Sequence, residues 1–167
     1  MQVGTAYNAW TSSLLLAKYL WLCSSGSTPL FDLPLPPTQI HHRSVLELGC
    51  GVGVVGFTAA KLGALVTMSD FNDDVLRNVV EGLQMNELQW GVGGVAVAKL
   101  DWGAEGDEAE GCTSKQRWYG GEDGDGTCAE FASVQRDIQF DVVLAADCCY
   151  EPDHPRLLCR LFALSLL

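Results

Sequence analysis

The stretch from Ser44 to Gly56 constrains the fold more than any other part of the chain. It reads S-V-L-E-L-G-C-G-V-G-V-V-G, a short apolar run followed by glycines at every second position. Such a run is typical of a buried parallel strand, and the glycines allow a sharp turn whose backbone stays open to a ligand. The apolar residues from Val54 to Leu62 predict a helix, whose free N–H groups would face that turn. The stretch therefore predicts the nucleotide-binding corner of a doubly wound α/β sheet.

The glycines of this stretch satisfy two binding patterns at once. Gly51-x-Gly53-x-x-Gly56 is the dinucleotide pattern. Glu47-x-Gly49-x-Gly51-x-Gly53 is the pattern of enzymes that use S-adenosylmethionine (SAM). A glycine-rich turn without a ligand is the third possibility, so the rest of the chain must decide among them.

Length, charge and cysteine content narrow the class of protein. The chain has 167 residues, which predicts one domain. Its formal net charge of -11 argues against a nucleic-acid partner, because phosphate binding needs a basic surface, and it suits a basic partner. The sequence shows neither a targeting segment nor an apolar run long enough to span a membrane, so no membrane partner is expected. Seven cysteines without C-x-x-C spacing favour reduced thiols over a disulfide framework or a metal site, and hence a cytoplasmic location, with the nucleus as an alternative.

Three further strands are predicted downstream, at residues 65–69, 93–100 and 140–146. They alternate with helical patterns, which predicts a parallel sheet with right-handed crossovers. Ligands bind beyond the carboxyl ends of such strands. Residues 103–130 interrupt this order, since Gly, Glu and Asp dominate them without periodicity. We therefore expect a single domain over residues 1–167 with an acidic, glycine-rich insert that is disordered or solvated.

Side chains beyond the strand ends have the chemistry to bind a cofactor and a substrate. Asp70 can accept both hydroxyls of a ribose, or it can cap the next helix, for which Asn72 is better placed. Trp102 offers a flat face to an adenine, or it packs in the core. Asp147 and Tyr150 can capture a cationic amine, or Asp147 can cap the next turn while Tyr150 packs. Residue chemistry alone leaves each pair of alternatives open.

Five segments carry a resemblance to a known family. Four of them are V-L-E-L-G-C-G-V-G-V-V-G at 45–56, S-D-F-N at 69–72, L-D-W-G at 100–103 and F-D-V-V-L-A-A-D-C-C-Y at 140–150. The fifth is Trp10, which precedes S-L-L-L-A-K-Y-L. Together these segments resemble the seven-β-strand SAM-dependent methyltransferases, and within them the protein-lysine methyltransferases with an Asp-x-x-Tyr motif (methyltransferase family 16-like).

The resemblance implies a Rossmann-like fold, SAM as cofactor, and a role for each residue that matches the family's motifs. The glycine turn would hold the methionine part of SAM by its backbone, with Glu47 on the amino group and Asp70 on the ribose. The two tryptophans would flank the cofactor, and Ala146 would line the floor of the pocket. The implied cofactor-binding residues are Trp10, Glu47, Gly49, Cys50, Gly51, Gly53, Asp70, Trp102 and Ala146. The implied lysine channel is formed by the catalytic residues Asp147 and Tyr150.

The predicted sheet departs from that of the family in one respect. The family has seven strands and only four are predicted here, so the chain resembles a C-terminally truncated methyltransferase with a sheet incomplete at the C-terminus. The expected function is methyl transfer from SAM to a lysine amine of a protein substrate. The alternatives are a small-molecule methyltransferase and a catalytically dead SAM-binding fragment. An NAD-dependent oxidoreductase is disfavoured by Trp102 and by the segment 147–150.

Overall fold

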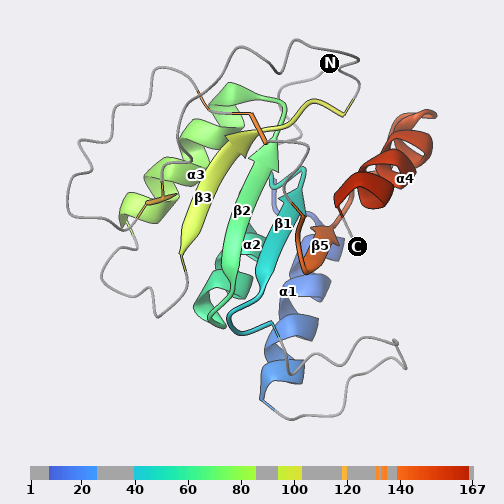
Figure 1. The fold of residues 1–167 in the computed structure, drawn as a ribbon. Helices are drawn as coiled ribbons and strands as arrows, with labels where there is room; N and C mark the ends of the chain where they lie inside the picture. The colour runs from blue at the N-terminus through green and yellow to red at the C-terminus, as the bar shows by residue number, and fades with distance from the viewer. Residues whose placement is uncertain are drawn as a thin grey trace.

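The computed structural model describes residues 8–25, 40–85, 94–102, 118–119, 131, 133–134 and 139–165. These residues form a five-stranded sheet in the order β4-β3-β2-β1-β5 with four helices. Figure 1 shows β3, β2, β1 and β5 side by side. The strands are β1 (Ser44–Leu48), β2 (Leu65–Asp70), β3 (Val95–Lys99), β4 (Trp118–Tyr119) and β5 (Val142–Ala145). The helices are α1 (Thr11–Ser24), α2 (Val54–Lys61), α3 (Asp73–Met85) and α4 (His154–Ser165). Among the described helices, none is both long and apolar enough to cross a membrane.

The four predicted strands are confirmed, with small differences in their ends. β1 pairs in parallel with β2 on one side and with β5 on the other, and β2 pairs in parallel with β3. The third and fourth predicted strands are shorter than expected, at Val95–Lys99 and Val142–Ala145. The last helix, α4, begins at His154, two residues after Pro152.

The insert at 103–130 contains a strand that the sequence analysis missed. Trp118 and Tyr119 form β4, which pairs antiparallel with Val95 and Ala96 of β3. The expectation of an insert without regular structure is therefore wrong at these two residues. Both are of β-prone types, and the edge of β3 offers backbone groups for pairing. The other residues of the insert lie outside the described part of the chain.

Two hydrophobic clusters cover the two faces of the sheet. The first combines β-strand residues such as Val45 with buried residues of α1, α2 and α3. The second combines Leu46 and Leu48 with Leu158 of α4. Successive residues of β1 thus point to opposite faces. Three helices bury one face, and α4 contributes Leu158 to the cover of the other.

In helix α3 the local sequence determines where the helix begins and which face is buried. Asn72 caps it, since its Oδ1 accepts a hydrogen bond from the backbone N–H of Asp74 at 2.9 Å. Val75, Val79 and Leu83 recur every four residues along α3 and form a buried apolar stripe. Cap and stripe together place the start of α3 directly after the end of β2, beside the glycine turn.

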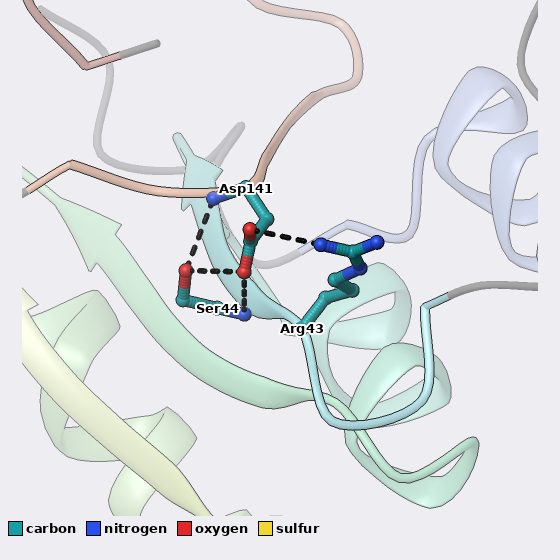
Figure 2. Close-up of polar contacts among 3 residues, drawn as sticks. All are labelled: Arg43, Ser44 and Asp141. Atoms are coloured by element: carbon teal, nitrogen blue, oxygen red, sulfur yellow. Dashed lines mark hydrogen bonds and ion pairs between the residues drawn. The ribbon is translucent and has the colours of Figure 1, made fainter. Parts of the chain in front are cut away.

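The start of the edge strand β5 is tied to β1 by one carboxylate. Asp141 accepts hydrogen bonds from the backbone N–H of Ser44 at 2.8 Å, from Ser44 Oγ at 2.9 Å, and from the Arg43 guanidinium at 3.2 Å (Figure 2). The backbone hydrogen bond from Ser44 is the main reason that the pKa of Asp141 is lowered. This contact agrees with the register in which Val45 lies opposite Val142. It therefore fixes which residues of the segment after β5 lie beside the glycine turn.

Candidate functional site

A cavity of about 630 Å³ opens at the carboxyl ends of β1, β2 and β5. Its wall is built by five segments: the start of α1, the turn after β1, the end of β2, the residues that follow β5, and α4 through Leu158. Eight of the residues predicted from sequence line it, namely Trp10, Gly49, Cys50, Gly51, Asp70, Ala146, Asp147 and Tyr150. The other three, Glu47, Gly53 and Trp102, are not part of its lining.

The glycine turn adopts a backbone that other residues rarely take. Gly53, the residue before α2, has φ of 78°, in the left-handed region. The conformation therefore favours glycine, and a Cβ at this position, 2.6 Å from Met68 Cε, would also have to displace the end of that side chain. Gly53 thus shapes the turn from behind, while Gly49 and Gly51 face the cavity.

Asp70 is a buried carboxylate in the cavity wall, with 7% of its surface exposed. Its Oδ1 accepts a hydrogen bond from the backbone N–H of Asn72 at 3.0 Å, and its Oδ2 accepts one from Gly51 at 3.4 Å. Burial raises the pKa of Asp70, and the backbone N–H groups of Asn72 and Gly51 partly oppose that shift. Because Asn72 supplies the cap of α3, the carboxylate of Asp70 is not needed as the cap. Its oxygens can therefore accept further hydrogen bonds from a ligand in the cavity.

Glu47 lies beneath the turn and not in the cavity wall. Only 4% of its surface is exposed, and its Oε2 has no hydrogen-bond partner among the described residues. A Cβ added at Gly56 would overlap this oxygen, so the carboxyl group packs against the first turn of α2. Burial raises the pKa of Glu47 to about 8; the backbone N–H of Gly56 partly opposes this shift, and the charge of Asp70 adds to it. The expected contact of Glu47 with the amino group of SAM stays a prediction.

The segment after β5 forms the wall opposite Asp70. Asp147 is exposed and has φ of 54°, which is uncommon for a residue other than glycine. Its carboxylate accepts a hydrogen bond from Ser12 in the first turn of α1. Tyr150 lines the cavity with 66% of its surface exposed, and its pKa is raised by burial of the phenol and by the charge of Asp70. The phenol therefore stays neutral.

Trp102 takes a different place from the one expected for a residue that flanks the adenine. It is half-buried in the cluster that contains Leu48 and Cys148. A Cβ at Gly49 would lie 3.7 Å from the indole ring, so the tryptophan packs against the back of the turn. This placement agrees with the alternative that Trp102 is a packing residue. Trp10, by contrast, lines the cavity at the position before α1 and is 47% exposed.

Sequence reasoning gave no role to Phe71, which lines the cavity beside Asp70 with 43% of its surface exposed. The available signal was its position directly after an acidic strand end, where an aromatic ring reaches the same edge of the sheet. Other lining residues without a predicted binding role include Asn8, Ser13, Val52, Asn72, Cys149 and Leu158.

The cavity therefore joins two kinds of wall. One wall has an open backbone turn, a buried carboxylate and an aromatic ring, which suits a ligand with hydroxyls and a flat base. The other wall has an exposed carboxylate and a neutral phenol, which suits a cationic group. Such an arrangement can hold two partners against each other.

The chain is similar to proteins of known family. The family described as lysine methyltransferase matches residues 1–116, which is 116 of the 167 residues. Protein N-lysine methyltransferase METTL21A of Xenopus tropicalis is 33% identical over 105 residues, covering 61% of this chain and 41% of that protein. Histone-arginine methyltransferase METTL23 of Xenopus laevis is 32% identical over 96 residues, covering 56% of this chain and 34% of that protein. The chain thus spans between a third and two fifths of the length of these relatives.

A solved structure shows the same fold. Magnesium protoporphyrin IX methyltransferase from Synechocystis PCC 6803, with bound SAH, superposes with a TM-score of 0.56 at 17% identity. The match covers 92% of this chain and 53% of that one. The chain therefore has the Rossmann-like α/β fold, as predicted from its sequence.

Proposed function

Because the chain belongs to the lysine methyltransferase family, we propose that it binds SAM in the cavity and transfers its methyl group to a lysine amine of a protein. The observation that supports this proposal is that the glycine turn, Asp70, Asp147 and Tyr150 all line one cavity. In this proposal the first pair would recognise the cofactor and the second pair the acceptor, as the resemblance implies. The acidic net charge of -11 suits a basic protein substrate and not a nucleic acid. A cytoplasmic location, where thiols stay reduced, is part of the proposal.

The residues present fit SAM. The cavity of about 630 Å³ falls within the usual size of small-molecule sites. Gly49 and Gly51 bring side-chain-free backbone to its wall, as the cofactor's methionine part requires. Asp70 would accept hydrogen bonds from the ribose hydroxyls. Phe71, exposed beside Asp70, is better placed than Trp102 to contact the adenine ring.

The remaining predicted residues would act around this core. Cys50 contributes its backbone to the turn, and its N–H already donates to the carbonyl of Ser69 at 2.9 Å. Gly53 shapes the turn, and Trp10 closes the cavity from the start of α1. Ala146 would line the floor, where a small side chain leaves room for the reacting groups.

The chemistry assigned to this chain is mainly alignment. When bound, SAM supplies a methyl group on a positively charged sulfur. Asp147 and Tyr150 would hold the lysine amine in line with that methyl group. Burial of the amine lowers its pKa and favours loss of its proton, whereas the charge of Asp147 attracts the ammonium but opposes deprotonation. The amine reacts through its lone pair, so the proton must leave before transfer.

The likeness to a histone-arginine methyltransferase favours a second candidate, in which the acceptor is an arginine guanidinium. A carboxylate beside an aromatic ring would attract this cation too. The two candidates differ in the residue that carries the new methyl group.

The proposal is tested by incubating the purified chain with methyl-labelled SAM and a cytosolic extract. We expect a labelled protein band whose methyl group maps to lysine by mass spectrometry. Label on arginine supports the second candidate, label on a small molecule supports that alternative enzyme, and absence of label despite SAM binding indicates a dead fragment. Titration calorimetry should show binding of SAM but not of NAD. Binding of NAD alone contradicts the assignment of the cofactor.

Asp70→Ala is expected to weaken SAM binding by about 1–3 kcal/mol, or roughly 5- to 150-fold in Kd, because a charged hydrogen-bond acceptor is lost. Titration calorimetry with SAM measures the effect. Asp74→Ala is the matched control, since Asp74 is exposed on α3 and is not part of the cavity wall. Equal affinity in the two variants would remove Asp70 from the cofactor site.

Asp147→Ala and Tyr150→Phe are expected to lower kcat/KM for the protein acceptor by roughly 10- to 150-fold, as for charge-assisted hydrogen bonds worth about 1.5–3 kcal/mol. Affinity for SAM should stay nearly unchanged, because both residues lie on the acceptor wall. Glu151→Gln, one residue further and exposed, serves as control. A loss of SAM affinity as large as the loss of transfer would place these residues on the cofactor side instead.

A further inference from the structure

His154 links the two sides of the site, although no motif in the sequence pointed to it. It is the first residue of α4 and is half-buried. Its imidazole lies edge-to-face against Tyr150, with ring centroids 4.9 Å apart and planes at 72°. It also lies edge-to-face against Trp102, at 5.2 Å and 71°. One side chain thus connects a ring from the end of β3 with a ring from the segment after β5.

The same imidazole holds the backbone of that segment. His154 Nδ1 lies 2.8 Å from the carbonyl oxygen of Cys148. A carbonyl oxygen can only accept, so Nδ1 must carry the hydrogen. In the neutral ring Nε2 is then left without one. The thiol of Cys148 donates to the carbonyl of Leu48 at 3.1 Å, so this residue is restrained on both sides.

Two residues that line the cavity, Asp147 and Tyr150, lie close to this restraint in the chain. Asp147 precedes Cys148 and has a left-handed backbone, which is uncommon for a residue other than glycine. Tyr150 is 66% exposed and so has little other packing to orient its ring. The imidazole is therefore placed to hold the Cys148 peptide, which lies between Asp147 and Tyr150 in the chain. It is also placed to orient the Tyr150 ring, which lines the cavity.

We propose that His154 is a positioning residue for the acceptor wall, which fixes the Cys148 peptide through Nδ1–H and orients Tyr150 through ring contact. The expected effect of His154 on methyl transfer rests on the proposed function, whereas the contacts that His154 makes do not depend on it. Because Trp102 packs against Gly49 and His154, and His154 packs against Tyr150, a continuous set of contacts connects the glycine turn to Tyr150. Trp102, which is not part of the cavity lining, connects the glycine turn to His154 in this set of contacts.

The first test is the tautomer of His154, which needs no activity. The full chain is labelled with nitrogen-15 in its three histidines, and ring nitrogen shifts are recorded in alkaline buffer, where imidazoles are neutral. His154→Asn removes one of the three sets of signals and so identifies it. We expect the hydrogen on Nδ1. A hydrogen on Nε2 overturns the proposal.

The second test is the ring of Tyr150, whose signals are identified by their loss in Tyr150→Phe. His154→Ala is expected to shift them, whereas Cys159→Ser, at an exposed position of α4, should not. Unchanged Tyr150 signals in His154→Ala overturn the proposal.

The third test separates positioning from general stability. His154→Phe keeps an aromatic ring but loses the hydrogen bond, and should lower kcat/KM for the labelled protein acceptor about fivefold. His154→Asn keeps a donor near the Cys148 carbonyl but loses the ring, and His154→Ala should cost more than either. Affinity for SAM should stay within about twofold of the parent. An equal fall in SAM affinity and in transfer marks a structural role and overturns the proposal. If the parent chain transfers no methyl group, the proposed function fails, while the tautomer and the Tyr150 signals still decide the role of His154.

Discussion

Replacing Glu47 by glutamine is expected to remove about 3 kcal/mol of pH dependence from the folding stability between pH 5 and pH 7. The buried carboxyl group has its pKa raised from 4.5 to about 8 in the folded chain. Between these values the folded state holds a proton that the unfolded state has lost. Stability therefore falls as pH rises, by about 1.4 kcal/mol per pH unit, and the loss is complete above the folded pKa.

The measurement is urea unfolding of the parent and of Glu47→Gln at several pH values. Asp70, whose pKa is also raised, contributes with the same sign to both proteins, so the difference between the two curves isolates Glu47. Asp141, whose pKa is lowered, contributes only at more acidic pH and with the opposite sign. Glu81→Gln, at an exposed position of α3, should run parallel to the parent. A Glu47→Gln curve parallel to the parent would mean that Glu47 is ionised in the folded chain.

Glu47 also shows which features the sequence could predict and which it could not. The strand and the glycine turn around it are local patterns, and both are confirmed. The neighbour of its carboxyl group is not local, since Gly56 reaches it only after the chain has turned into α2. The sequence therefore showed a carboxylate beside a turn but not the side of the turn on which it lies.

The same division holds elsewhere in the site. The cap at Asn72 was predictable because donor and acceptor lie two residues apart. The place of Trp102 was not, because its position against Gly49 and His154 depends on three segments meeting. The two-residue strand β4 was missed for a similar reason, since it exists through pairing with the distant β3. Contacts between distant segments were thus the part that a single sequence left open.

Replacing Gly56 by alanine is expected to lower the free energy of unfolding by about 3 kcal/mol or more, because the new methyl group overpacks a buried site. Its Cβ would overlap Glu47 Oε2 and lie 2.8 Å from Met68 Cγ. Both side chains are buried and have little room to move. The gain in helix propensity from glycine to alanine, about 1 kcal/mol, only partly offsets this cost.

Gly82 in α3 provides a matched control for Gly56. A Cβ at Gly82 would come no closer than 3.3 Å, to the Cζ atom of Phe57. Gly82→Ala should therefore stay within about 1 kcal/mol of the parent in urea unfolding, because the propensity gain meets only a mild contact. Equal stability of the two variants would show that the space beneath α2 can relax.

A double variant shows whether Glu47 or Met68 accounts for the cost of the methyl group added at Gly56. Glu47→Ala removes the overlapping oxygen, so Gly56→Ala should cost less in that background than in the parent, and the difference is the coupling between the two positions. Met68 stays in place and keeps part of the penalty. In the parent background the methyl group must push α2 away from β1 and so displace the turn at Gly49 and Gly51. We therefore expect Gly56→Ala to weaken SAM binding as well. Additive costs in stability would instead assign the whole penalty to Met68.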